Sequence, residues 1–235
     1  MLAHLDVARS LIRPGRTLAA VPSRRSLVAG LAAVTLMSLL AAAVVIPRVD
    51  YARAADLKVS MGPGAAEMTP HALEEAVATD VKLARVGAWS KALLVPALRA
   101  LGIALAAFLA FRVAGGRPTF ADSTAVAAIA VLPLALRDLL AIPAALVRGS
   151  IPPSDAAHLL PSSLAVLVPP GAPAPLAGAA AGLDLFGAWC AVLLAIGMTA
   201  AARVSARRAA VVVAILFVAL IAVADVALPA LAPRS

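Results

Sequence analysis

A continuous apolar segment of membrane length limits what this chain can fold into. Ser26 to Pro47 forms 22 residues without a charge, between Arg25 and Arg48. The hydrocarbon core of a bilayer is about 30 Å thick, and a helix rises about 1.5 Å per residue, so about 20 apolar residues span it. The segment therefore predicts a transmembrane helix.

The composition indicates that this helix is one of several. Of the 235 residues, 63% are hydrophobic and 14% are charged, whereas soluble domains are about half apolar and about a quarter charged. Disordered chains are poor in apolar residues, and a content of 3% aromatic residues does not fit the aromatic girdles of a membrane β-barrel. The sequence predicts an all-α integral membrane protein, a helical bundle.

Four further apolar segments bring the expected number of transmembrane helices to five. The expected spans are 26–47, 89–111, 121–147, 185–202 and 209–231. The third is interrupted by Pro133, Pro143 and internal charges. Residues 1–25 are expected to form a basic cytoplasmic segment, and residues 26–235 a single transmembrane domain.

Two of the connections carry structural signals. In the long first loop, Thr69-Pro70 has the pattern of an N-cap followed by proline at the first helical position, so a loop helix is expected from there towards the second span. In the proline-rich third loop, Leu159 to Val168 is apolar but too short to span, which predicts a short interfacial or re-entrant segment.

The basic residues predict the orientation. Residues 1–25, the second loop and the fourth loop together hold ten Lys and Arg residues in short segments, whereas the first loop has six basic and six acidic residues. By the positive-inside rule the N-terminus is cytoplasmic and the C-terminus lies outside. The excess of Arg over Lys and the abundance of Ala are typical of a GC-rich bacterial genome, so a bacterial plasma (inner) membrane is expected. The net charge of +8 follows from these flanking residues, and nucleic acid is not an expected partner.

An export signal is the alternative interpretation of the first segment. Ser23-Arg24-Arg25-Ser26-Leu27 is similar to a twin-arginine signal, and Ala52-Arg53-Ala54 has the form of a cleavage site. The apolar core of 22 residues exceeds the roughly 7–15 residues of a signal peptide, however. We therefore expect an uncleaved first span.

Residues suited to catalysis are sparse. His4, His71 and His158 are scattered, Cys190 is the single cysteine, and the sequence has no phosphate-binding loop or nucleophile elbow. Ser154 and Asp155 lie near His158, in a loop with no further catalytic signal. We expect no enzymatic activity, no cofactor and no metal site.

Charges within the spans are the strongest candidates for a site, because a charge at membrane depth is costly and usually has a reason. When depth is counted at about 1.5 Å per residue from the cytoplasmic end of each span, these charged residues fall in the outer half of the bilayer. The expected intramembrane polar cluster consists of Arg99, Arg137, Asp138, Asp184 and Asp225. The second, third and fifth spans are expected to be neighbours, with Asp225 paired with Arg99 or Arg137, whereas Asp184 lies at the outer mouth of its span. The cluster fixes helix packing, lines a substrate or ion path, or consists of side chains that extend to the membrane interface.

Several motifs resemble the Yip-domain family of polytopic membrane proteins. They are Pro14 to Thr17, Gly115-Gly116-Arg117-Pro118-Thr119-Phe120, Leu132-Pro133 through Leu136-Arg137, Leu183-Asp184-Leu185-Phe186, Trp189, Leu193 and Ile196-Gly197-Met198. The resemblance implies five spans, a cytoplasmic N-terminus and an outside C-terminus. Eukaryotic members are associated with Rab GTPases and vesicle traffic, but residues 1–25 are shorter than the cytosolic regions of many of them, so a GTPase is not among the expected partners.

The expected function is that of a non-catalytic membrane-organising or scaffold factor that acts through helix association. The alternative is a small transporter or permease subunit that uses the intramembrane Arg/Asp cluster. The expected partners are the lipid bilayer and, within it, other membrane proteins or further copies of the chain.

Overall fold

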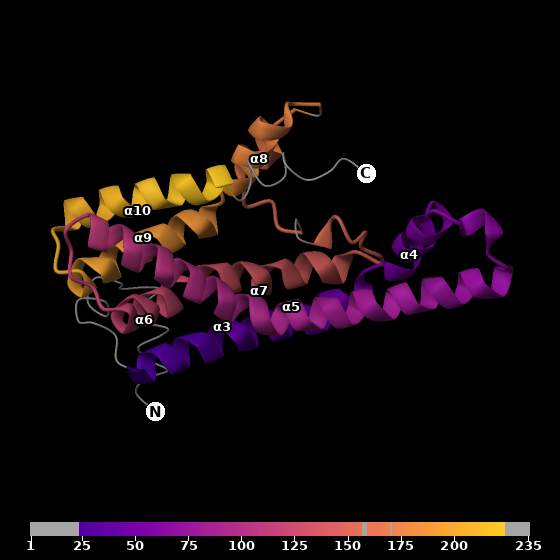
Figure 1. Ribbon diagram of the computed structural model, residues 1–235, viewed down its shortest axis with the longest axis horizontal. Coiled ribbons are helices and arrows are strands. Elements are labelled where there is room, and N and C mark those ends of the chain that lie inside the picture. Colours follow the sequence, from indigo (N-terminus) through magenta and orange to yellow (C-terminus); the bar gives the residue numbers. More distant parts are fainter. Residues whose placement is uncertain (1–23, 157–158, 170, 224–235) are drawn as a thin grey trace. The chain divides into compact units, whose positions relative to one another are not determined.

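The computed structural model describes residues 24–156, 159–169 and 171–223, and this part of the chain is helical without a β-strand (Figure 1). The predicted all-α class is thereby confirmed. The helices are α3 (Arg24–Val45), α4 (Tyr51–Ser60), α5 (Pro70–Val113), α6 (Phe120–Ala130), α7 (Leu132–Val147), α8 (Ala174–Gly182), α9 (Leu185–Ala201) and α10 (Ala206–Ile221). Most of the predicted cytoplasmic segment 1–25 lies outside the described residues.

Three stretches are long and apolar enough to cross a membrane: Leu27–Arg48, Pro70–Val113 and Phe120–Val147. They correspond to the first three predicted spans, the first of them shifted by one residue. The fourth predicted span corresponds to α9, an apolar helix of 17 residues. The fifth begins in α10, and its remaining residues, 224–231, lie outside the described part of the chain. Three of the five spans therefore meet the length criterion, and the number five stays a prediction.

Helix α5 joins the predicted loop helix and the second span into one helix of 44 residues. It begins at Pro70 as predicted, where the backbone N–H of Ala72 donates to Thr69 Oγ1 at 3.3 Å. Its end is a Schellman motif, in which Gly115 has φ +81° and the N–H of Gly116 donates to the carbonyl of Phe111 at 2.8 Å. The glycines at 115 and 116 therefore terminate α5.

The third predicted span consists of two helices that meet at Val131. Pro133 has no N–H to offer the carbonyl of Ile129, so the hydrogen-bond ladder of α6 ends there. In α7 the same proline occupies the first turn, where no N–H is required for the helix. At the other end of the span, Thr119 caps α6 by accepting from the N–H of Asp122 at 3.1 Å.

The chain divides into two compact units, and the first comprises residues 1–34, 96–137 and 161–235. Within its described part, α9 packs against both α6 and α10. The core of this unit is built from fully buried residues such as Val126, Leu193 and Met198. Gly197 allows α9 to approach α6 closely, because a Cβ there would overlap Val126.

The second unit comprises residues 35–95 and 138–160. Its core gathers four buried residues from the ends of helices and from loops: Val49, Ala145, Ile151 and Leu159. A parallel bridge between Val49 and Ile151 ties the chain after α3 to the chain after α7. Helix α4 is joined to α5 by an ion pair between Lys58 and Asp80.

The short apolar segment of the third loop contains a 3₁₀ turn at Leu164–Leu167. The side chains of Leu164, Val166 and Leu167 are exposed. This geometry is consistent with a segment that does not span, and its interfacial or re-entrant placement stays a prediction.

Candidate intramembrane polar site

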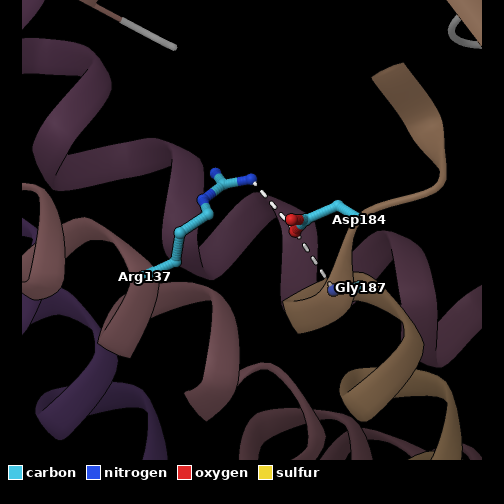
Figure 2. A network of polar contacts seen from close by, with 3 residues as sticks. All are labelled: Arg137, Asp184 and Gly187. Carbon is cyan, nitrogen blue, oxygen red and sulfur yellow. Dashed lines mark hydrogen bonds and ion pairs between the residues drawn. The ribbon is translucent and has the colours of Figure 1, made fainter. Parts of the chain in front are cut away.

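An ion pair between Arg137 and Asp184 is the centre of the candidate site. Figure 2 shows the Arg137 guanidinium, from α7, directed at the Asp184 carboxylate at the start of α9, with Nη1 3.5 Å from Oδ2. The Asp184 side chain is 9% exposed and that of Arg137 is 31% exposed. The carboxylate is therefore buried, whereas the guanidinium is reached from the surface.

Asp184 is held in place by local structure as well as by Arg137. It is the N-cap of α9, and its Oδ2 accepts the N–H of Gly187 at 3.3 Å (Figure 2). Aspartate is favoured at this position because its carboxylate satisfies a free backbone donor and faces the positive end of the helix dipole. The position of Asp184, directly before the apolar run of α9, can be read from the sequence alone.

The proline-rich loop fixes the backbone on both sides of Asp184. The N–H of Leu164 donates to the carbonyl of Leu183 at 3.1 Å, and the N–H of Leu185 donates to the carbonyl of Ser162 at 3.0 Å. These bonds form an antiparallel bridge between Ser163 and Asp184. The loop therefore helps to position the carboxylate.

The second carboxylate oxygen of Asp184 is available to accept a hydrogen bond. Oδ1 is buried and has no hydrogen-bond partner within the part of the chain that the structure describes. A buried acceptor without a partner is costly, which makes such an atom a point where a proton, a water molecule or another donor is accommodated. The arrangement can thus stabilise packing between α7 and α9 or accept a hydrogen bond from a further donor.

The structure places the other predicted members of the cluster in different surroundings. Arg99 lines a cavity together with residues of α9 and α10. Asp138 accepts a hydrogen bond from the Ser38 hydroxyl of α3 at 3.2 Å. Asp225, the predicted partner of Arg99 or Arg137, lies outside the described residues. The predicted pairing of Asp225 is therefore untested and stays a prediction. Arg137 forms an ion pair with Asp184, the cluster member that was assigned only to the mouth of its span.

Two features of this site were missed by sequence reasoning. Ser38, the donor to Asp138, lies in an uncharged segment that offers no signal for a polar partner. The backbone pairing around Asp184 joins a loop to a helix start about 20 residues away, and no periodic pattern predicts it. Only the capping role of Asp184 had a local signal, the aspartate directly before an apolar run.

Residues suited to metal binding are dispersed. Across residues 24–156, 159–169 and 171–223, no group of three His, Cys, Asp or Glu side chains is arranged to hold a metal ion. Cys190 is buried in α9. Among the three histidines, His4 and His158 lie outside the described residues, and His71 is exposed on α5.

The apolar helices and the ion pair between them define a helical integral membrane protein. Residues 8–227 match the family model described as the Yip1 domain, so the chain belongs to the Yip1-domain family. No curated protein and no solved structure matches the chain. The matched region includes both partners of the ion pair, Arg137 and Asp184, which also belong to the motifs that carried the resemblance.

Proposed function

We propose that this Yip-type membrane protein is a non-catalytic scaffold that organises other proteins in the bilayer through helix association. The observation that carries the proposal is the length of α5. Its 44 residues measure about 66 Å at about 1.5 Å per residue, more than twice the roughly 30 Å hydrocarbon core. A large part of α5 therefore extends beyond the membrane as a continuation of a membrane helix.

The extramembrane part has the surface of a protein-binding element. We define residues 51–88, which contain α4 and the beginning of α5, as the α4–α5 arm. Its exposed apolar side chains are Leu57, Met61, Met68, Leu83 and Val86. A contiguous apolar patch on an otherwise charged surface is typical of interaction sites, and methionine adapts its shape to a partner, so the proposal requires that these side chains act together. The arm thus offers a surface for another membrane protein or a second copy of the chain.

The proposed topology has five spans, with the N-terminus in the cytoplasm and the C-terminus outside, in a bacterial plasma membrane. The distribution of basic residues supports it, because the short second and fourth loops hold Arg112, Arg117, Arg203, Arg207 and Arg208. In this topology the α4–α5 arm lies outside the cytoplasm. Its partners would then be periplasmic segments of membrane proteins.

Site-specific photocrosslinking in the native membrane tests the scaffold proposal. A photoreactive residue at Met61, which is 77% exposed, or at Leu83 is expected to give discrete protein adducts that can be identified by mass spectrometry. The matched control is Glu74, which is exposed on the polar part of the same arm. Adducts of equal yield at all three positions, or none at Met61 and Leu83, would contradict a specific contact surface.

A small transporter or permease subunit is the second candidate function. It is favoured by the buried Asp184 carboxylate beside Arg137, since ionisable residues within membranes often belong to proton or ion pathways. Proton flux into proteoliposomes of the purified chain, reported by a trapped pH dye, separates the two functions. Flux that Asp184→Asn abolishes would favour transport and overturn the scaffold proposal.

A further inference from the structure

A cavity of about 270 Å³ lies within the first compact unit, between α5, α7, α9 and α10. Its walls include Cys190, Ala191 and Leu194 of α9, and Phe217 and Leu220 of α10. Arg99 of α5 is the one charged side chain among the described residues that line it. The cavity therefore combines an apolar interior with a single positive charge.

Arg99 occupies a position where a lone charge is costly. It lies 12 residues before Phe111, which places it about 18 Å from the cytoplasmic end of the second span. Its side chain is exposed, as are those of its neighbours Leu98 and Leu101. No ion pair to Arg99 is present in the part of the chain that the structure describes. A guanidinium at this depth requires an anion or access to the headgroup region.

We propose that this cavity binds one acyl chain of an anionic phospholipid and that Arg99 binds the phosphate of the same lipid. The planar guanidinium donates two parallel hydrogen bonds to phosphate oxygens, and its long side chain can extend towards the outer headgroups. The apolar walls match a hydrocarbon chain. The volume is below the roughly 300–1,000 Å³ of pockets that enclose drug-sized ligands, so the cavity accommodates part of one chain and the rest of the lipid stays in the bilayer. The proposal goes beyond the scaffold function and does not depend on it.

Native mass spectrometry of the full-length chain in detergent tests the proposal. The probes are phosphatidylglycerol and phosphatidylcholine with identical palmitoyl and oleoyl chains, titrated separately. Both lipids carry a phosphate, but the choline cation neutralises that of phosphatidylcholine. The unaltered chain is therefore expected to bind one phosphatidylglycerol at least about tenfold more tightly than phosphatidylcholine, a difference that corresponds to about 1.4 kcal/mol. Arg99→Gln should reduce this ratio to about one, and Arg99→Lys should retain part of it, because the charge remains without the planar fork.

Two further variants separate the cavity from general attraction to anionic lipid. Ala191→Phe fills the cavity and should weaken the binding of both lipids. Arg112→Gln removes a charge from the same helix outside the cavity and should leave the lipid ratio unchanged. Circular dichroism verifies that each variant is folded, and Leu216→Trp replaces Ala191→Phe if the latter does not fold.

Two outcomes would overturn the proposal. One is an equal affinity of the unaltered chain for the two lipids, or a preference for phosphatidylglycerol that survives Arg99→Gln. The other is a preference that arises only in Asp225→Asn, because a carboxylate of the protein would then be the partner of Arg99. The first result rejects the lipid site, and the second assigns Arg99 to the polar cluster.

Discussion

Gly197 occupies a position on α9 where a methyl group has no room. A Cβ there would overlap Cγ1 of Val126 and lie 3.2 Å from Cγ2 and 3.3 Å from Cβ of the same residue. Because valine is branched at Cβ and fully buried here, rotation of its side chain does not relieve the overlap. Gly197→Ala is expected to lower the free energy of unfolding by about 1–3 kcal/mol, measured in mixed detergent micelles.

The matched controls for this prediction are another helical glycine and a compensating change. A Cβ at Gly102 of α5 would meet no atom within 4 Å, so Gly102→Ala should be neutral or stabilise by about 0.5–1 kcal/mol. Val126→Ala should recover part of the loss caused by Gly197→Ala. Equal effects of the two glycine substitutions would show that close packing of α6 and α9 is not the cause.

The Asp184 carboxylate combines two roles that substitutions can separate. Asp184→Ala removes the cap of α9 and the anion beside Arg137, whereas Asp184→Asn retains an acceptor for the Gly187 N–H. The alanine variant should be less stable than the asparagine variant by about 1 kcal/mol, the usual value of an N-cap. In a double-mutant cycle, Asp184→Asn with Arg137→Gln should destabilise less than the sum of the single variants, by about 0.5–3 kcal/mol. Additive effects would show that the pair is not coupled.

At the scale of elements, Ile151 is expected to contribute more to the second unit than the ion pair between α4 and α5. Ile151 is fully buried, and its backbone exchanges hydrogen bonds of 2.9 Å with the carbonyl of Arg48 and the N–H of Asp50. Ile151→Ala should lower the free energy of unfolding by about 2–5 kcal/mol. Lys58, by contrast, has a side chain that is 71% exposed, so Lys58→Ala should cost at most about 1 kcal/mol.

Hydrogen–deuterium exchange of the amides in α4 reports on the same unit. Exchange should accelerate strongly in Ile151→Ala and little in Lys58→Ala. The control is the β-branched, exposed Val147→Ala, because Val147 is 88% exposed and makes little core contact. A larger effect of Lys58→Ala than of Ile151→Ala would contradict the assignment of the core.

Helix starts were predictable from the sequence because they depend on a few adjacent residues. Thr69-Pro70 identified the first turn of α5, and the apolar run that begins at Leu185 identified the start of α9. The length of α5 was not predicted, since its charged residues Glu74, Glu75 and Lys82 indicated a loop helix that leads towards the span but is distinct from it. No proline interrupts the helix between Pro70 and Pro96, so the ladder of hydrogen bonds continues between them.

At the scale of the whole molecule, the ion pair between Arg137 and Asp184 was not predicted from the sequence, and the predicted pairing of Asp225, which lies outside the described residues, stays a prediction. Depth along each helix follows from counting residues, and it favoured Asp225 as a partner of Arg99 or Arg137. Rotation of each helix and the course of the loops decide which charges meet. The Arg137–Asp184 pair depends on both, because the proline-rich loop also fixes the backbone at Asp184.

Topology is the property of the whole molecule that the basic residues predict most directly. Ala66→Cys, Val113→Cys and Ala206→Cys place thiols at exposed positions without removing any arginine. They are made in a Cys190→Ala background, which removes the single native thiol. In intact cells a membrane-impermeant maleimide is expected to label position 66 alone, and positions 113 and 206 should react only after permeabilisation. The reason is that arginines near these two positions are retained on the cytoplasmic side, whereas the electrically balanced first loop is free to translocate. Labelling of positions 66 and 113 from the same side would contradict the orientation, and with it the placement of the α4–α5 arm outside the cytoplasm.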